Sequence, residues 1–329
     1  MLFHSRPIHH FIYVQEWAQK HQAKVQLDLS NFQLSVMLRN RYYDFFPQFV
    51  QRLDGRLSYS KTLNWQSTGF IGWLPYSLKQ WPEAVSKLEF KASMQRMGQR
   101  IPQYWTADNG ALKNVIIKAN RGSFGVGIRG PYQTIGASNP VHQLVEAEFY
   151  EQFIVGNIIK AWFWNDSPIC LEKRLTPVVE GNGVLTIRQL VIDTFNVKSP
   201  ERLRAFNAQQ GRMLDTLSFQ ALTWEDILPA GQKAYVDFLY GSCLFPDNDF
   251  TENKNLLHQG VDENFERSLK HLGNMLWSII PKNTRNGVLY AVDGVLDMDG
   301  NCWWLEMNCN PMFPPDAYET MLNDLFKVE

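Results

Sequence analysis

Apolar and polar residues alternate most clearly near the end of the chain, in the segment 288–311. Two runs rich in branched and aromatic residues flank Asp299-Gly300, and Asp-Gly between such runs is a strong signal for a tight β-hairpin. With Asp299 and Gly300 as the two loop residues, the register places Asp293 opposite Glu306. The pattern therefore predicts a hairpin in which two carboxylates face each other.

The opposed carboxylates predict a metal site on one face of this hairpin. Like charges that oppose each other directly destabilise a sheet, and Asn308 points to the same face as Glu306 because side chains alternate along a strand. Two carboxylates and an amide oxygen suit Mg²⁺ as ligands. The alternative is an exposed face on which the charges are simply hydrated.

The first eighty residues carry shorter patterns. They predict a helix over 14–21, a strand over 24–29 and a second helix over 34–53. Five aromatic residues then follow at Trp65, Phe70, Trp73, Tyr76 and Trp81. We expect these rings to pack in a core between subdomains, because no basic residues interleave with them as binding of single-stranded nucleic acid requires.

Residues 196–282 are predicted to be mainly helical, apart from a polar loop over 247–255. The region ends in an amphipathic helix, whose apolar stripe consists of Phe265, Leu269, Leu272, Leu276 and Ile279. No repeat and no linker separates the parts of the chain, so we expect the subdomains to pack around a shared cleft.

Composition narrows the classes of function. The chain has 329 residues, 45% of them hydrophobic and 20% charged, with a net charge of -1. No whole-protein field therefore favours nucleic acid or an anionic membrane, and any anion site must be local. The cysteines show no C-x-x-C spacing, so we expect Cys302 and Cys309 to be buried thiols and not zinc ligands.

The N-terminal sequence is too polar for a signal peptide, and no apolar run approaches 18 residues. These features predict a cytoplasmic protein that does not bind membranes. The His9-His10 pair has no other spaced ligand near it, so we expect both rings at the surface.

Ser86 and Glu89 have the spacing of a capping box and predict a helix that begins at Lys87. The dipole of the helix favours an anion at its first turn. A lysine in this first turn is unfavourable unless a negative group docks against it. Lys87 therefore indicates a phosphate ligand. The alternative is an exposed lysine.

A strand that carries Lys118 leads into a loop with Gly122, Gly125 and Gly127. Glycines let the backbone approach a ligand and turn its N–H groups toward phosphate oxygens. No Gly-Lys-Ser/Thr follows, so this is not a Walker A loop, and it is not the dinucleotide fingerprint either. The alternative is an ordinary glycine turn between two strands.

In this order the elements resemble the ATP-grasp superfamily, over roughly residues 86–311. The family pattern has a lysine that opens a helix, a lysine before a Gly-rich hairpin, an acidic residue that leads the adenine hinge, and then acid…E-x-N. The matching residues of this chain are Lys87; Lys118 with Gly122, Ser123, Gly125 and Gly127; Glu151, Gln152, Phe153 and Ile154; and Asp293, Glu306 and Asn308.

The resemblance implies an α+β fold with two α+β lobes whose antiparallel sheets sandwich ATP. It implies a small lobe over 84–155, a large lobe over 156–329 with a helical insert at about 196–282, and an additional N-terminal α/β subdomain over 1–83.

The resemblance also implies roles. Lys87 and Lys118 hold the phosphates, the Gly-rich loop closes over them, and the backbone of the hinge reads adenine. The acidic set binds one or two Mg²⁺ ions, with Mn²⁺ as an alternative.

Arg188 looks like the strand arginine of the tubulin-tyrosine-ligase-like branch, which faces the acyl phosphate. Arginine offers a planar, always-charged fork for phosphate or carboxylate. The resemblance implies that Arg188 and Lys118 are the catalytic residues. Lys160 lies on a nearby predicted strand. It either adds to the positive charge around Arg188 or lies on a solvated strand edge.

The predicted reaction is ligation of a carboxylate to an amine or thiol. ATP phosphorylates the carboxylate, and the incoming nucleophile displaces phosphate. The carboxylate belongs to an amino acid, a small metabolite, or a peptide or protein tail. The alternatives are a kinase of the same fold that phosphorylates a hydroxyl with Asp297 or His142 as base, and a non-catalytic nucleotide-binding module.

Overall fold

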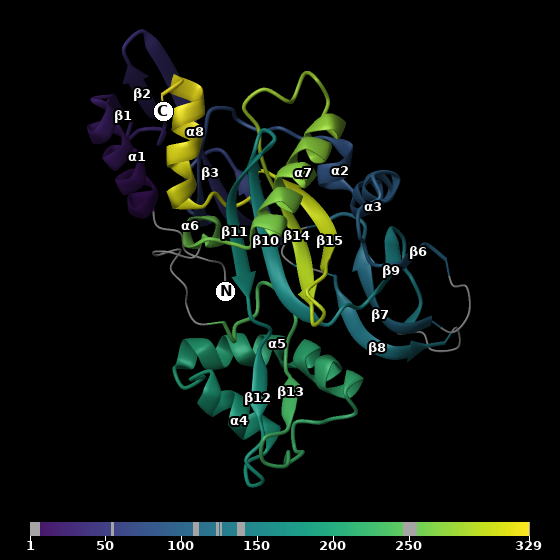
Figure 1. Ribbon diagram of the computed structural model, residues 1–329. Helices are drawn as coiled ribbons and strands as arrows, with labels where there is room; N and C mark the ends of the chain where they lie inside the picture. The colour runs from purple at the N-terminus through teal and green to yellow at the C-terminus, as the bar shows by residue number, and fades with distance from the viewer. Residues whose placement is uncertain are drawn as a thin grey trace.

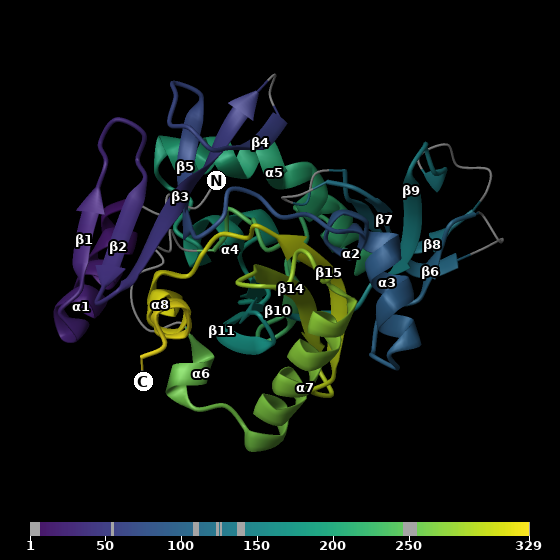
Figure 2. The same cartoon turned by 90° about the horizontal axis from the view of Figure 1, so that it is seen from above.

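The computed structural model describes residues 7–53, 56–107, 112–122, 125, 127–136, 142–245 and 255–328, without the side chains of 52, 56 and 57. The fold is α+β, as predicted. The two lobes contain one four-stranded antiparallel sheet each, and the N-terminal part contains a five-stranded sheet. Seen from above, the sheet of the large lobe lies between the N-terminal part and the small lobe (Figure 2).

The N-terminal part is one helix followed by an antiparallel sheet in which β1 to β4 are adjacent in sequence order and β5 pairs with β3. Its elements are α1 (Pro7–His21), β1 (Lys24–Leu27), β2 (Leu34–Leu38), β3 (Arg41–Leu53), β4 (Arg56–Ser60) and β5 (Ser67–Leu74). The helix over 14–21 and the strand that begins at Lys24 are confirmed.

The helix predicted over 34–53 is wrong, because this segment forms β2 and β3. Leu34, Val36 and Leu38 are buried while the residues between them are more exposed, which is the period of two of a strand. The segment is also rich in aromatic residues, which fit the half-buried surface of a sheet better than a helix.

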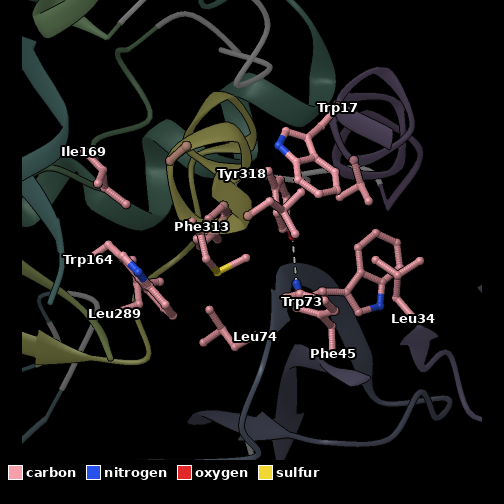
Figure 3. Close-up of a cluster of buried hydrophobic side chains, with 14 of the residues drawn as sticks. Trp17, Leu34, Phe45, Trp73, Leu74, Trp164, Ile169, Leu289, Phe313 and Tyr318 are labelled. Atoms are coloured by element: carbon pink, nitrogen blue, oxygen red, sulfur yellow. Dashed lines mark hydrogen bonds between the residues drawn. The ribbon is translucent and has the colours of Figure 1, made fainter. Parts of the chain in front are cut away.

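The C-terminal segment returns to the N-terminal part. The 3₁₀ turn η2 (Pro315–Ala317) leads into α8 (Tyr318–Phe326), which packs on α1 (Figure 1). The Tyr318 hydroxyl accepts a hydrogen bond of 2.8 Å from the backbone N–H of Trp73 (Figure 3). Trp164 of the large lobe lies in the same core, so this core fixes the N-terminal part to the large lobe.

The expectation that the aromatic cluster is core holds for most of its members. Phe70, Trp73 and Trp81 are buried, and the Tyr76 hydroxyl accepts a 2.9 Å hydrogen bond from the backbone N–H of Leu289. Trp65 is the exception, because its side chain is 90% exposed.

His10 is fully buried, so its predicted place at the surface is wrong. It shares a face of α1 with Val14 and Trp17, and its Nδ1 lies 3.1 Å from the Tyr318 hydroxyl. Burial, with a smaller contribution from His9, lowers the pKa of His10 to about 3.

This buried imidazole predicts a loss of stability in acid. Between the unfolded pKa near 6.5 and the folded pKa near 3, the unfolded state binds more protons, so the free energy of unfolding falls as the pH falls. We expect His10 to contribute a loss of about 2 kcal/mol between pH 7 and pH 5. Urea unfolding of the wild type and of His10→Gln at both pH values measures this contribution. The carboxylates titrate in both proteins, so the difference between the two pH dependences belongs to His10. Equal pH dependence in the two proteins would contradict the assignment.

The small lobe consists of two short helices and an antiparallel sheet of order β6-β9-β7-β8. Its elements are α2 (Pro82–Val85), α3 (Lys87–Arg96), β6 (Tyr104–Trp105), β7 (Leu112–Ala119), β8 (Arg129–Ile135) and β9 (Glu148–Gln152). As predicted, Ser86 caps α3: its Oγ accepts a 3.2 Å hydrogen bond from the backbone N–H of Glu89. The reciprocal bond of a capping box is replaced, because the N–H of Ser86 donates to the Pro82 carbonyl.

The large lobe has an antiparallel sheet of order β11-β10-β14-β15. Its elements are β10 (Gly156–Trp164), β11 (Ser167–Arg174), α6 (Leu256–Gln259), α7 (Glu263–Ile279), β14 (Leu289–Asp297) and β15 (Cys302–Cys309). α7 is the predicted amphipathic helix and covers one face of the sheet (Figure 1), where Leu269 and Leu276 pack in one core with Phe163 and Val292. The alternation of the strands places Lys160 and Asp293 on the opposite face, which further along the strands carries Trp162 and Trp164 and packs against the N-terminal part.

An insert between β11 and α6 forms a separate core below the sheet in Figure 1. Its elements are β12 (Val178–Glu180), α4 (Ile187–Thr194), α5 (Pro200–Phe219) and β13 (Lys233–Tyr235). The region 196–282 is thus less helical than predicted between α5 and α7, and residues 247–254 of the predicted loop lie outside the described residues. In the part of the chain that the structure describes, no helix combines the length and apolar character needed to span a membrane.

Candidate functional site

The two carboxylates that the sequence placed on a hairpin do oppose each other. Asp293 on β14 pairs with Glu306 on β15. The turn spans residues 297–301 instead of the predicted two-residue loop, since Leu296 pairs with Cys302. A β-bulge beside Asp293 shifts the register by one residue, and this shift compensates for the longer turn.

Each carboxylate has a lysine partner. Lys160 Nζ on β10 lies 2.6 Å from Asp293 Oδ1, and Lys87 Nζ lies 3.0 Å from Glu306 Oε2. Burial raises the pKa of Asp293, and the charge of Glu306 adds to this effect. Burial alone would also raise the pKa of Glu306, but Lys87 and Lys118 lower it below the ordinary value. Asp293 is therefore the carboxylate that an additional cation would stabilise most.

A third carboxylate lies between two lysines in the small lobe. Lys118 on β7 places its Nζ 2.6 Å from Glu151 Oε1, and Lys91 on α3 places its Nζ 2.5 Å from Glu151 Oε2. All three side chains are buried. Lys118 and Glu151 were both predicted for the site, but no motif singles out Lys91.

Between the lobes lies a cavity of about 540 Å³. Lys87, Lys118 and Lys160 line it from different elements, together with Asp293, Glu306 and Asn308. The four predicted hinge residues also line it, in the chain crossing from β9 to β10: Glu151, Gln152, Phe153 and Ile154. The cavity therefore brings together the predicted residues of both lobes.

The wall of the cavity around Phe153 is apolar. The ring of Phe153 packs edge-on against Phe219 of α5 and Phe238, with ring centroids 5.2 and 5.0 Å away. Ile116 and Leu239 line the same cavity. These walls suit a planar, mostly apolar ring system.

The Gly-rich segment that joins β7 to β8 also borders the cavity. Gly122 and Gly125 line the cavity, and both have positive φ, as does Gly127. Lys87 Nζ donates a 2.9 Å hydrogen bond to the Gly122 carbonyl, so the same lysine contacts this loop and Glu306. Ser123 lies outside the described residues.

Arg188 does not lie where the sequence predicted. The segment is the helix α4 and not a strand, and a capping box between Thr186 and Gln189 begins it. The Arg188 guanidinium lies over the Trp224 ring and bonds Gln210, and the residue does not line the cavity.

Arg212 of α5 lines the cavity instead, and sequence reasoning missed it. Its guanidinium donates to both carboxylate oxygens of Asp237, at 2.9 and 2.7 Å. Burial would lower the pKa of Arg212, but Asp237 holds it above the ordinary value. Arg212 lies on α5 one turn before the buried Thr216, and no sequence motif marks it.

The oxygen atoms of the hairpin fit a hard cation. Asn308 Nδ2 donates a 2.8 Å hydrogen bond to Asp293 Oδ2, which leaves the amide oxygen out of this bond. Among the described residues, no group of three or more His, Cys, Asp or Glu side chains is arranged to hold a metal. The set is thus two carboxylates and an amide. This set suits Mg²⁺, because water and substrate usually supply the remaining ligands of that cation.

The charges of this site favour an anion. Four lysines surround three carboxylates: Lys87, Lys91, Lys118 and Lys160 with Glu151, Asp293 and Glu306. A buried cluster with an excess of cations is stabilised by a negative ligand. The geometry can therefore hold a polyphosphate beside a metal ion, with a planar ring against the hinge.

Comparisons with known proteins give structural similarity only. No protein-family model matches the sequence, and a search of curated proteins gives no match. A bifunctional glutathione synthetase from Pasteurella multocida is 14% identical with a TM-score of 0.43, over 99% of this chain and 45% of that one. D-alanyl-alanine synthetase A from Vibrio cholerae is 10% identical with a TM-score of 0.41, over 98% and 92%.

The ATP-grasp ligase PsnB, complexed with its minimal precursor, is 10% identical with a TM-score of 0.36, over 73% of this chain and 60% of that one. The chain thus spans less than two thirds of PsnB and less than half of the Pasteurella multocida protein. At these identities and TM-scores we base the function on the site itself.

Proposed function

We propose that this chain is an ATP-grasp enzyme that uses ATP and Mg²⁺ to join a carboxylate to an amine, with release of ADP and phosphate. The observation that carries the proposal is the cavity itself. Three lysines, two opposed carboxylates and an apolar hinge meet there between two antiparallel sheets.

Different residues of the cavity wall bind the base and the phosphates of the nucleotide. The backbone of residues 151–154 contacts the adenine edge, and Phe153 belongs to the apolar wall beside the ring. Lys87 and Lys118 hold the phosphates, with Gly122 and Gly125 of the loop beside them. Cations at these positions are favoured by the negative charge that phosphates carry.

Asp293, Glu306 and Asn308 would hold Mg²⁺, which supplies positive charge to the transferring phosphoryl group. Lys160, which now pairs with Asp293, would be available to an anionic ligand with a cation bound there, because that cation would repel the ammonium. The ammonium lies 5.2 Å from the ring centroid of Tyr240, which stabilises its charge in this position.

The chemistry takes two steps. A carboxylate oxygen of the substrate attacks the γ-phosphorus of ATP, and ADP leaves. The amine then attacks the acyl carbon, phosphate leaves, and the amine loses a proton. The residues of the chain contribute positioning and charge neutralisation, which is what phosphoryl transfer mainly requires.

Neither base considered for a kinase lines the cavity. Asp297 accepts hydrogen bonds from Trp303 and from the backbone of its own turn, and His142 packs against Tyr132. This observation favours the ligase over phosphorylation of a hydroxyl.

Lys118→Met is expected to weaken binding of a non-hydrolysable ATP analogue with Mg²⁺ by about 10- to 100-fold, because a charged hydrogen bond contributes about 1.5–3 kcal/mol. Isothermal titration calorimetry measures the effect. Lys113→Met is the matched control, since Lys113 lies on the same strand but is exposed. Wild-type protein that binds no analogue at millimolar concentration would overturn the proposed function.

Product analysis then identifies the reaction. We expect ADP and free phosphate to appear only when a carboxylate and an amine are both supplied, from panels of amino acids, peptides and small metabolites. A stably phosphorylated hydroxyl product would show a kinase instead. Nucleotide binding without turnover on any panel would favour the non-catalytic module.

A further inference from the structure

The small lobe uses two lysines for one carboxylate. Lys91 and Lys118 contact the two different oxygens of Glu151, at 2.5 and 2.6 Å. Lys91 is fully buried and Glu151 is 1% exposed. One of these lysines would already complete an ion pair, so the second requires an explanation.

The two lysines differ in their access to the cavity. Lys118 lines it, but Lys91 does not. Lys91 lies on α3 one turn after Lys87, so the two point to the same side of the helix. Lys87 reaches the Gly122 carbonyl and Glu306, whereas Lys91 reaches Glu151 beneath the cavity wall. A ligand can therefore contact Lys118 and cannot contact Lys91.

The second lysine has an energetic cost. Burial lowers the pKa of Lys91, and Glu151 opposes this effect. Removing an ammonium ion from water costs several kcal/mol unless its partner repays it. An apolar residue at position 91 would avoid this cost, since Phe90 and Met94 of the same helix are buried in a hydrophobic core.

We propose that Lys91 is a positioning residue that keeps Glu151 neutralised when Lys118 leaves it to bind the phosphates of ATP. This inference rests on the proposed function. In the structure Lys118 is bound to Glu151, so a phosphate that binds Lys118 competes with that carboxylate for its ammonium group. Without Lys91 the exchange leaves a buried carboxylate unpaired, which is strongly unfavourable. With Lys91 in place, the exchange leaves a complete ion pair.

Lys91→Met tests the proposal, because Met has a similar length and no charge. We expect the affinity for a non-hydrolysable ATP analogue with Mg²⁺ to fall by about tenfold or more, measured by calorimetry on the full chain. The circular dichroism spectrum and the unfolding transition show whether the variant is folded. If Lys91→Met does not fold, Lys91→Gln removes the same charge and keeps a polar group.

The double variant Lys91→Met/Glu151→Gln separates positioning from packing. It removes one positive and one negative charge, so the net charge of the cluster equals that of the wild type, and no carboxylate holds Lys118 back. We expect it to recover most of the affinity lost in Lys91→Met. Loss through damaged packing would not be recovered by a change at Glu151.

The outcomes distinguish the two proposals. Unchanged affinity in folded Lys91→Met, or no recovery in the folded double variant, overturns the role of Lys91 alone. Wild-type protein that binds no ATP analogue overturns the proposed function instead. A loss of affinity in Lys91→Met that the double variant reverses supports both proposals.

Discussion

Glu306→Gln is expected to reduce Mg²⁺-dependent ATP turnover by at least about 100-fold, equivalent to about 2.7 kcal/mol in the barrier, with the fold intact. Gln keeps the shape of Glu306 but cannot neutralise a divalent cation. Asp293 would remain with Asn308 as its neighbour, which gives one carboxylate where the proposed site has two.

Nucleotide affinity without metal provides the control. Glu306 forms an ion pair with Lys87 across 3.0 Å, and the variant frees this lysine for a phosphate. We therefore expect ADP to bind the variant in EDTA at least as tightly as it binds the wild type, whereas the gain in affinity on adding Mg²⁺ is lost. Titration of Mg²⁺ at fixed ADP measures this gain. If Glu306→Gln turned over ATP as fast as the wild type, with the same midpoint in the Mg²⁺ titration, Glu306 would not bind the metal.

Gly273→Ala is expected to lower the free energy of unfolding by about 2–3 kcal/mol, although alanine is the better helix former. A Cβ at Gly273 would lie 2.0 Å from the carbonyl oxygen of Asp166 and 3.1 Å from the Phe163 ring. The contact is backbone, so a rotamer change cannot relieve it. α7 would have to move away from the sheet, and with it the residues that pack behind Asp293.

Gly211→Ala is the matched control for this prediction. Gly211 lies inside α5, is exposed, and has no atom within 4 Å of the position of an added Cβ. Helix propensity alone then applies, and we expect the free energy of unfolding to rise by about 0.5–1 kcal/mol. Urea unfolding measures the free energy of unfolding of both variants, which should fall in Gly273→Ala and rise in Gly211→Ala. A stabilised Gly273→Ala protein would show that α7 does not pack this closely on the turn at Asp166.

The core of the proposed site was readable from sequence because its residues depend on local patterns. The alternation of β14 and β15 placed Asp293 and Glu306 on one face, and the capping residue Ser86 fixed where α3 begins. Even here the register was correct only because a bulge compensates for a longer turn. The bulge adds Leu305 to β15, so the buried Trp304 and Met307 are three residues apart instead of two.

Other predictions failed where a local pattern admitted two readings. The segment 34–53 has enough apolar residues for a helix, but the period-two burial of β2 and the aromatic residues of β3 fit strands. The segment that contains Arg188 is rich in branched residues, which favours a strand, yet the capping box at Thr186 and Gln189 begins a helix there. As a result Arg188 lies away from the cavity, and Arg212 takes a place in its wall.

By itself, the sequence determined the opposed acidic pair and the helix that begins at Lys87, which follow from side-chain alternation and helix capping over a few residues. The α+β class and the predicted role of Lys118 came from the resemblance that the motifs, in their order along the chain, bear to a known family. Only the tertiary structure decided that Lys160 meets Asp293 and that Lys91 meets Glu151. These contacts join residues that are far apart in the chain, and their energies depend on burial, which exists only once the lobes have packed.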